Sequence, residues 1–361
     1  MNRNSSEYFT GCLLGGAVGD AIGWPVEFAD MSEIIGRFGP DGIINMVPGT
    51  GGFYEITDDT QLTLFTAEGL LRAWTMACRS GEAPDFAATV KHSYLSWLHT
   101  QGEYEVENVC TGWLLGIEGL HQRRAPGDTC LSALRKGALL ETSFADNNSK
   151  GCGGIMRAAP AGLIAARIIT HDIDASARLA FDIGCVTAHL THGHPSGYFP
   201  AGVLAAIIAT IIIGRSLEDA ISISLEILSG RNGAEETVAA VHTAVDLWRN
   251  KEVLPSLKAI EMLGKGWSGE EALAIGLYCA LVAGSDFMRG VRLAVNHSGD
   301  SDSTGSITGN ILGAKLGEQA IPGDCLNQLE LGDVARQVGE DLFTAFEETR
   351  EWLKRYPPLK Y

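Results

Sequence analysis

The sequence predicts an all-α protein, and three observations support this fold class. Apolar residues recur at i, i+3 and i+4 in one segment after another, which is the spacing of one face of an α-helix. Alternating strand patterns are hard to find, and the connecting segments are rich in Gly, Asp, Asn and Pro. The 361 residues, 45% hydrophobic and 20% charged, have the composition of an ordinary globular protein. No low-complexity linker divides the chain, so we expect residues 1–361 to form a single domain.

The helical spacing predicts helices along the whole chain. In order, they cover about 7–22, 60–77, 86–98, 155–169, 174–188, 197–213, 216–229, 234–250, 270–283, 286–295, 304–316 and, as a C-terminal helix, 332–354. Two stretches, 23–58 and 100–154, lack this spacing and are long enough to be functional loops.

Two of the predicted helices carry a glycine at every fourth position, at residues 11, 15, 19 and 23 in the first and at 305, 309, 313 and 317 in the second. Each such glycine costs roughly 1 kcal/mol relative to alanine in a helix. Close approach of another backbone would offset that cost, whereas two unrelated flexible helices are the alternative. We predict that the two glycine stripes pack antiparallel. Asp20 and Glu27 would then lie near Asp300 and Asp302.

Charge and hydropathy exclude some functions. The formal charge of −17, with no cluster of Lys and Arg, argues against a nucleic-acid surface. The most apolar stretch, 201–214, has about 14 residues against the roughly 20 that span a bilayer, which predicts a core helix. We find no basic N-terminal region followed by an apolar segment, and the eight cysteines are dispersed without a C-x-x-C pair. These features predict a cytoplasmic protein with reduced thiols and no membrane association.

Residues 298–306 read SGDSDSTGS and place two carboxylates before a predicted helix. Asp302 or Ser303 could simply cap that helix, since Asp and Ser are common N-cap residues. A cap needs only one acceptor, however, and the neighbouring Asp300 and Asp302 repel each other. An EF-hand loop is excluded because its twelfth position, Ile311, lacks the required Glu. A hard cation held with other ligands remains the alternative to a cap.

A second acidic turn, EITDDTQ at 55–61, repeats this pattern. Thr57, Asp58 and Asp59 stand before an amphipathic helix, where one Asp would suffice as a cap. Together with Glu27, the two turns supply five carboxylates and two hydroxyls without His or Cys. Such a donor set suits Mg²⁺ or Mn²⁺ rather than zinc, and five negative charges favour two metal ions.

Five motifs between about residues 10 and 318 carry a family resemblance. They are GCLLGGAVGDAIGWPVEF, TDDTQLTLFTAEGL, NNSKGCGGIMRAAPAGL, LTHGHPSGYFPAG and HSGDSDSTGSITGNILGAKLG. In this order they resemble the motifs of the ADP-ribosylglycohydrolase family. The resemblance implies a single-domain orthogonal helical bundle, a binuclear Mg²⁺ or Mn²⁺ centre, and hydrolysis of the bond between C1 of an ADP-ribose and its acceptor.

The resemblance also assigns residues by position. It implies that the metal ligands are Thr57, Asp58, Asp59, Asp300, Asp302 and Ser303, and that Glu27 either ligates or gates the centre. Glu27, Asp58 and Asp302 would be catalytic, and the substrate would be bound by Asn148, Ser149, Lys150, Gly151, Gly153 and His192.

The loop at 147–160 offers backbone N–H groups to a pyrophosphate, with Lys150 or Arg157 able to add charge; an ordinary loop entering a helix is the alternative. Cys152 stands where relatives often carry Asn, and no activating base suggests a nucleophilic role for it. The spacing of His189, His192 and His194 would permit zinc binding, but no fourth ligand is indicated.

The resemblance implies an ADP-ribosylated protein or small molecule as substrate, with an ADP-ribosyltransferase as a possible counterpart. ADP-ribosyl-arginine is the expected substrate, although several relatives select arginine with an Asp near residues 100–110, where this chain offers Glu103, Glu105 and Glu107. Two alternatives belong to other classes. One is a non-catalytic family member that binds ADP-ribose or blocks a toxin, and the other is a calcium-stabilised structural domain.

Overall fold

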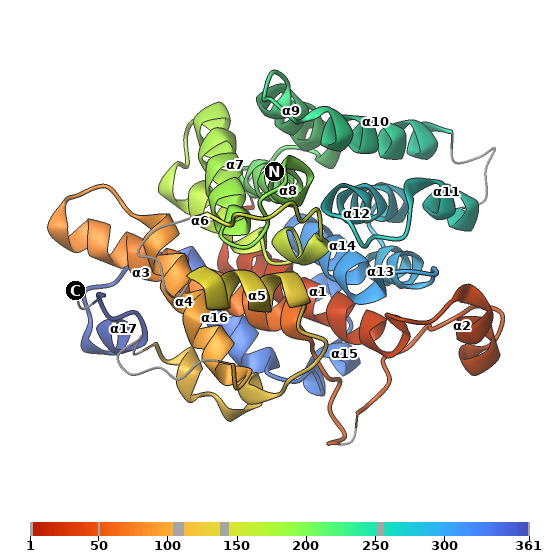
Figure 1. Cartoon of the computed structure of the whole chain (residues 1–361), viewed down its shortest axis with the longest axis horizontal. Coiled ribbons are helices and arrows are strands. Elements are labelled where there is room, and N and C mark those ends of the chain that lie inside the picture. The colour runs from red at the N-terminus through yellow and green to blue at the C-terminus, as the bar shows by residue number, and fades with distance from the viewer. Residues whose placement is uncertain (1–2, 50, 104–111, 138–143, 251–255, 360–361) are drawn as a thin grey trace.

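The structure is a computed structural model that describes residues 3–49, 51–103, 112–137, 144–250 and 256–359. Within these ranges the chain forms seventeen α-helices. In the described part of the chain, the β-structure consists of two isolated bridges, Tyr54 with Leu329 and Gly151 with Ser268. The all-α class expected from the sequence is therefore confirmed (Figure 1).

The helices follow one another along the chain in this order: α1 (Ser6–Gly23), α2 (Met31–Phe38), α3 (Asp58–Ser80), α4 (Phe86–Thr100), α5 (Asp128–Gly137), α6 (Ala159–Ile168), α7 (Ile173–His189), α8 (Pro195–Ile212), α9 (Leu217–Leu228), α10 (Glu235–Arg249), α11 (Ser256–Leu263), α12 (Gly269–Ala283), α13 (Phe287–Val295), α14 (Ser301–Leu316), α15 (Gly323–Asn327), α16 (Gly332–Thr344) and α17 (Arg350–Arg355).

The prediction of one C-terminal helix at 332–354 was wrong. The chain leaves the helical conformation at Ala345, which has φ of +65°, so α16 and α17 are separate. Both pack on the same core, because Trp352 donates from its indole N–H to Thr75 and the Tyr356 hydroxyl donates to Asp341 of α16. The apolar spacing therefore continues across a break that the sequence pattern does not reveal.

The two stretches expected to be loops contain helices as well. The first, 23–58, includes α2, which begins with a capping box in which Asp30 accepts from the backbone of Glu33. The second, 100–154, includes α5. Both helices are short, and their few apolar positions gave too weak a periodicity to predict them.

The glycine stripes of α1 and α14 pack against each other, as predicted. A Cβ added to Gly15 would lie 2.4 Å from the carbonyl oxygen of Gly309, and one added to Gly19 would lie 2.0 Å from that of Gly305. Gly11 faces Gly313, so the two helices run antiparallel. They lie side by side near the middle of the molecule (Figure 1).

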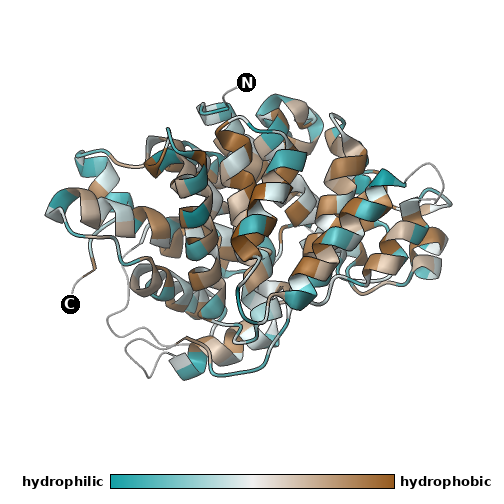
Figure 2. Ribbon diagram, turned by 90° about the horizontal axis from the view of Figure 1, so that it is seen from above, coloured by the Kyte–Doolittle hydropathy of each residue, from teal (hydrophilic) through white to brown (hydrophobic). Residues whose placement is uncertain are grey.

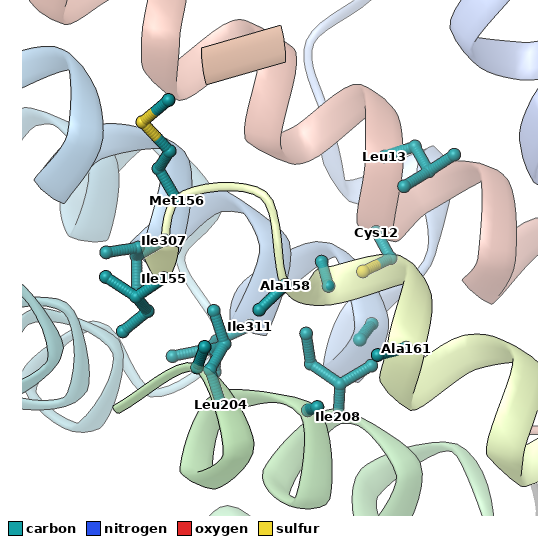
Figure 3. Close-up of a cluster of buried hydrophobic side chains, with 14 of the residues drawn as sticks. Cys12, Leu13, Ile155, Met156, Ala158, Ala161, Leu204, Ile208, Ile307 and Ile311 are labelled. Carbon is teal, nitrogen blue, oxygen red and sulfur yellow. The ribbon is translucent and has the colours of Figure 1, made fainter. Parts of the chain in front are cut away.

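The apolar core surrounds this central pair. Leu204 and Ile208 of α8 lie beside Ile307 and Ile311 of α14 and Ile155 of the segment before α6 (Figure 3). By length and composition α8 could cross a membrane, but 89% of it is buried inside the protein. This burial confirms the expected core helix at 201–214. Around it, most helices carry both hydrophobic and hydrophilic residues (Figure 2).

The α1 and α14 contact also fixes the positions of the acidic segments. A Cβ on Gly23, the last residue of α1, would lie 2.5 Å from the Cα of Asp302. The segment that leaves α1 and reaches Glu27 therefore starts beside the first turn of α14. The beginning of α3 joins this junction through Asp20 of α1, as described below.

Replacing Gly309 by alanine is expected to destabilise the fold, because the new Cβ would lie 2.0 Å from the carbonyl oxygen of Gly15. Overpacking of this kind lowers the free energy of unfolding by about 1–3 kcal/mol, which urea denaturation can measure. Gly36→Ala in α2 is the matched control, since no atom lies within 4 Å of its added Cβ. That variant should be neutral or more stable by up to about 1 kcal/mol. Equal stability of the two variants would contradict close packing of the stripes.

Candidate active site

The first acidic turn begins α3. Thr57 is the N-cap residue, and its hydroxyl oxygen accepts a hydrogen bond from the backbone N–H of Asp59 at 3.2 Å. Since a single hydroxyl caps the helix, neither carboxylate of the turn is needed for that purpose. Asp58 accepts from the backbone N–H of Gly127 at 3.2 Å, whereas Oδ2 of Asp59 is buried without a hydrogen-bond partner. The turn therefore holds carboxylate oxygen that the protein itself does not use.

The second acidic turn begins α14, and here Asp300 is the N-cap residue. Its carboxylate accepts from the backbone N–H of Ser303 at 3.4 Å and from the thiol of Cys152 at 2.6 Å. Asp302 lies inside the first helical turn, where its carboxylate also accepts from Ser303, at 2.9 Å. The helix is thus capped by Asp300, and the cap proposed for Asp302 is not the role this structure gives it.

Glu27 completes the acidic cluster from a third segment. It follows the short 3₁₀ turn Trp24–Val26, is 7% exposed, and its Oε2 atom is buried without a hydrogen-bond partner. Carboxylate oxygens of Glu27, Asp300 and Asp302 lie within 4.8 Å of one another. Two segments that are far apart in the sequence, the one at Glu27 and the turn with Asp300 and Asp302, therefore place their carboxylates in one small volume.

Burial and mutual repulsion hold protons on these carboxyl groups. Burial and the nearby Asp300 raise the pKa of Glu27 to about 9. Burial raises the pKa of Asp58 to about 8, and burial with neighbouring carboxylates raises the pKa values of Asp59 and Asp302 well above their usual range. Buried carboxylates of this kind need a compensating positive charge to ionise.

The residues present fit one or more hard divalent cations. The donors that converge are carboxylate and hydroxyl oxygens, and two carboxylate oxygens, on Glu27 and Asp59, are buried without hydrogen-bond partners. Oxygen-only sets of this kind suit Mg²⁺ and Mn²⁺. Asp58 and Ser303, from the first turns of α3 and α14, line the same cavity as the cluster, whereas Thr57, the N-cap residue of α3, does not line it.

Asp20 supports the first acidic turn from inside the molecule. It lies on α1, is 0% exposed, and accepts hydrogen bonds from the backbone N–H groups and hydroxyls of both Thr57 and Thr60. The Thr57 hydroxyl donates a hydrogen bond to Asp20 at 2.9 Å. The lone pairs of the hydroxyl oxygen therefore remain free to cap the helix and to bind a cation. Hydrogen bonds behind a ligand fix its orientation in this way.

A cavity of about 200 Å³ opens above the cluster. It is lined by the acidic residues of both turns, by Glu27, and by a glycine-rich loop, a histidine and a tryptophan. In full, the lining residues are Glu27, Asp58, Asp59, Ala125, Gly127, Asp128, Thr129, Cys130, Gly151, Cys152, Gly153, Met156, His192, Trp267, Asp300, Asp302 and Ser303. The structure therefore brings most of the sequence-predicted site residues to one cavity.

The glycine-rich loop lies against His192. Added Cβ atoms at Gly151 and Gly153 would each lie 3.3 Å from Nε2 of His192, so a larger side chain would press on this ring. His192 is 1% exposed, its Nδ1 atom pairs with the Thr191 hydroxyl at 2.8 Å, and burial lowers its pKa to about 3. A neutral imidazole therefore forms one wall of the cavity.

Several predicted substrate-binding residues lie outside the cavity. Asn148 is exposed, Ser149 pairs with Thr129, and the ammonium group of Lys150 donates to Glu236 at 2.6 Å. Arg157 is 0% exposed and donates to the sulfur of Cys130 and to the hydroxyl of Thr191. Because its guanidinium is buried and hydrogen-bonded to residues of the interior, Arg157 cannot bind a phosphate in the way that the sequence suggested.

The three histidines considered for zinc do not converge. His189 stacks between Phe144 and Tyr198, with ring centroids 4.5 and 4.6 Å away, while His194 caps α8.

A further histidine, His297, precedes the second acidic turn. Burial lowers the pKa of His297 to about 4, and its Nε2 atom pairs with Thr304 at 2.9 Å. Thr304 lies on the inner side of α14, so His297 supports that helix from behind and does not contact the cavity.

Some residues of the site were not predicted from the sequence. Asp128 and Trp267 line the cavity, and Phe28 stacks on Trp267. Asp128 and Trp267 lie in segments without helical spacing or a recognised motif. Phe28 ends the first family motif, but nothing in that motif indicated that its ring lies beside the cavity. Residues 105 and 107, two of the glutamates weighed for acceptor recognition, lie outside the described residues. Glu103 forms ion pairs with Arg123 and Arg135.

The helical fold is that of an ADP-ribosylglycohydrolase, and the chain belongs to that family. The family model matches residues 1–352. Members act on ADP-ribosylated substrates and are generally metal-dependent hydrolases.

Individual relatives are similar over nearly their full lengths. ADP-ribosyl-[dinitrogen reductase] glycohydrolase of Rhodospirillum rubrum is 24% identical, and the match covers 91% of this chain and 93% of the relative. An uncharacterized protein of Archaeoglobus fulgidus is 28% identical, and the match covers 93% of this chain and 96% of that protein. A solved structure described as an ADP-ribosylglycohydrolase-related protein complex aligns with a TM-score of 0.61 and 25% identity, covering 94% of this chain and 98% of its own.

We expect Asp20→Asn to weaken Mn²⁺ binding about 10- to 100-fold, because the amide no longer accepts from both hydroxyls that orient the turn. Titration of Mn²⁺ followed by electron paramagnetic resonance measures this affinity directly. Asp172→Asn, at the exposed N-cap of α7, should bind Mn²⁺ like the parent protein. Unchanged affinity in Asp20→Asn would show that Asp20 is not a support of the site.

Metal removal should make stability depend on pH. The folded pKa values of Glu27 and Asp58, about 9 and 8, exceed their ordinary values of 4.5 and 3.8. The folded state therefore binds more protons, and the stability of the metal-free protein falls as pH rises from about 4 through 9. Mn²⁺ should raise Tm more at pH 8.5 than at pH 5.5, which differential scanning calorimetry can test. Glu27→Gln should reduce this pH dependence. A Mn²⁺ effect on Tm that is the same at both pH values would contradict the prediction.

Proposed function

We propose that the protein is a metal-dependent hydrolase that removes ADP-ribose from arginine side chains of modified proteins by cleaving the bond at C1 of the ribose. The observation that carries the proposal is the buried cluster of Glu27, Asp300 and Asp302 at the base of a cavity. Family membership and the activity for which the Rhodospirillum rubrum relative is named support the same chemistry.

We propose two Mg²⁺ or Mn²⁺ ions as cofactors. The residues that would hold them are Thr57, Asp58, Asp59, Asp300, Asp302 and Ser303, with Glu27 alongside. When bound, such ions fix ribose hydroxyls and lower the pKa of a water molecule. The oxygens without partners on Glu27 and Asp59 support this assignment, because they otherwise stay buried without compensation.

The protein's own groups account for the rest of the reaction. The oxygen of a water molecule bonds to C1 as the bond from C1 to the acceptor nitrogen breaks. The nitrogen keeps the electron pair of that bond and leaves with a proton that a carboxyl group takes from the water and passes on. Asp58 and Asp302 can take the proton that the water loses, and their negative charge, with that of Glu27, stabilises the positive charge that develops on the ribose ring. All three carboxylates line the cavity in which the ribose would lie.

The cavity suits the ribose end of the substrate. Its volume of about 200 Å³ is below the roughly 300–1,000 Å³ of pockets that enclose a drug-sized ligand. The remainder of ADP-ribose would therefore extend outside it, along the exposed Asn148 and the partly buried Ser149 and Lys150. Lys150 would have to leave Glu236 to meet a phosphate.

Two further parts of the proposal concern context. The seven cysteines in the described ranges are free thiols, which supports a cytoplasmic location. An ADP-ribosyltransferase that makes the substrate is the natural counterpart in this scheme. The non-catalytic alternative is less well supported, since a protein that only blocks a toxin has no need of a complete set of buried carboxylates. Hydrolysis of ADP-ribosylated arginine, serine and nucleobase substrates with Mg²⁺ and Mn²⁺ in turn would distinguish the two functions.

We predict that Asp302→Asn lowers turnover of ADP-ribosylated substrate at least about 10-fold, equivalent to 1.4 kcal/mol of transition-state stabilisation. The metal-free variant should be as stable as the parent or more stable, because one of the repelling carboxylates becomes neutral. A steady-state assay at limiting Mg²⁺ and a thermal scan in EDTA measure the two effects.

Asp182→Asn is the control for this variant. Asp182 is an exposed residue of α7 that pairs with Arg231, far in the sequence from both acidic turns, and its loss should leave turnover intact. Parent-like activity in Asp302→Asn would remove Asp302 from the catalytic machinery.

A further inference from the structure

Two aromatic rings stand at the mouth of the cavity. Phe28 and Trp267 stack with their ring centroids 5.7 Å apart and their planes 18° from parallel. Phe28 is 72% exposed, the largest exposed fraction among the exposed large apolar side chains of the described residues, and Trp267 is 42% exposed. Trp267 also lines the cavity itself. Two large rings thus remain in water beside a polar site, an arrangement that often marks a binding surface.

Phe28 adjoins the acidic cluster in the chain, and Trp267 is linked to it through one residue, Cys152. Phe28 follows Glu27 in the chain. The backbone carbonyl of Trp267 accepts a hydrogen bond from the N–H of Cys152 at 3.1 Å, and the thiol of Cys152 donates to Asp300. The rings therefore lie beside the acidic cluster, so an acceptor joined to C1 of a ribose bound at that cluster can reach them.

The charges around the mouth favour a cation. Six carboxylates line the cavity, on Glu27, Asp58, Asp59, Asp128, Asp300 and Asp302, and no Lys or Arg of the described residues lines it. Two divalent ions would supply four positive charges, so the six ionised carboxylates would still leave the cavity with a net negative charge. Lys265 is exposed near Trp267 but is not among the lining residues. A planar cation would meet both favourable charge and ring faces here.

We infer that Phe28 and Trp267 form the binding site for the guanidinium group of the acceptor, so that the site selects arginine-linked over hydroxyl-linked ADP-ribose. This inference rests on the proposed function. The guanidinium of an arginine-linked substrate is planar and charged, and it stacks on aromatic rings, of which tryptophan binds cations best. A serine-linked substrate has no positive charge and no planar group at that position. Asp128, exposed on the same rim, adds negative charge on the acceptor side.

The test compares kcat/KM for arginine-linked and serine-linked ADP-ribose peptides, each assayed with the same Mg²⁺ concentration. Trp267→Leu and Phe28→Leu keep apolar volume but remove the ring face, and each should lower kcat/KM for the arginine-linked peptide about 3- to 30-fold. The serine-linked value should stay within about 2-fold. Trp267→Phe restores a ring and should recover part of the arginine preference. Phe53→Leu, at an exposed aromatic residue that does not line the cavity, should change neither value.

Other outcomes overturn the inference. Equal losses on both peptides would show that the rings contact the ADP-ribose portion common to both, and no loss in either variant would show that they contact no substrate. If the parent protein hydrolyses only the serine-linked peptide, the proposed hydrolase activity is supported and the proposed guanidinium-binding site is rejected.

If no substrate is turned over, the proposed function fails, and calorimetric binding decides the inference alone. Arginine-linked ADP-ribose binding more tightly than ADP-ribose, with the difference lost in Trp267→Leu, supports it. Equal affinities overturn it.

Discussion

The direct backbone contact between α1 and α14 is the constraint on which the rest of the structure depends. Every fourth residue along each helix is a glycine, and an added Cβ at any of the central positions would collide with a carbonyl group of the other helix. Because the helices run antiparallel, the end of α1 meets the start of α14. The acidic turn of α14, the segment leading to Glu27 and the support from Asp20 are thereby placed together. A small change in helix separation would move all three relative to one another.

The acidic centre places function in opposition to stability. Five buried carboxyl groups with raised pKa values are unfavourable in a metal-free interior, and among the residues that the structure describes no Lys or Arg lines the cavity to neutralise them. Each helix start is capped by only one of its polar side chains, Thr57 or Asp300, so the other carboxylates have no structural role that outweighs their repulsion. Groups kept under such conditions at a cavity are characteristic of functional sites.

The sequence revealed the parts of this protein that depend on local periodicity or on repeated polar spacing. The all-α class, the packing of the stripes and the meeting of the two acidic turns with Glu27 all followed from such patterns. The break at Ala345 did not, because residues on both sides of it face the same core. Burial of Arg157 and the pairing of Lys150 with Glu236 depend on tertiary neighbours that no local pattern encodes. Phe28 and Trp267 are adjacent only after folding, so their stacking was likewise invisible in the sequence.

The wide spacing of the site along the chain has a consequence for biosynthesis. Glu27 and the turn at Thr57 leave the ribosome early, whereas Asp300 and Asp302 emerge only after α12 and α13 have been made. Until then the glycine face of α1 has no partner, and the acidic residues near it face water or other segments. A nascent chain that lacks α14 therefore cannot assemble the acidic cluster of Glu27, Asp300 and Asp302, and a cation held by this cluster would bind only after α14 has packed on α1. A divalent cation bound at this point would fasten the first and last thirds of the polypeptide together.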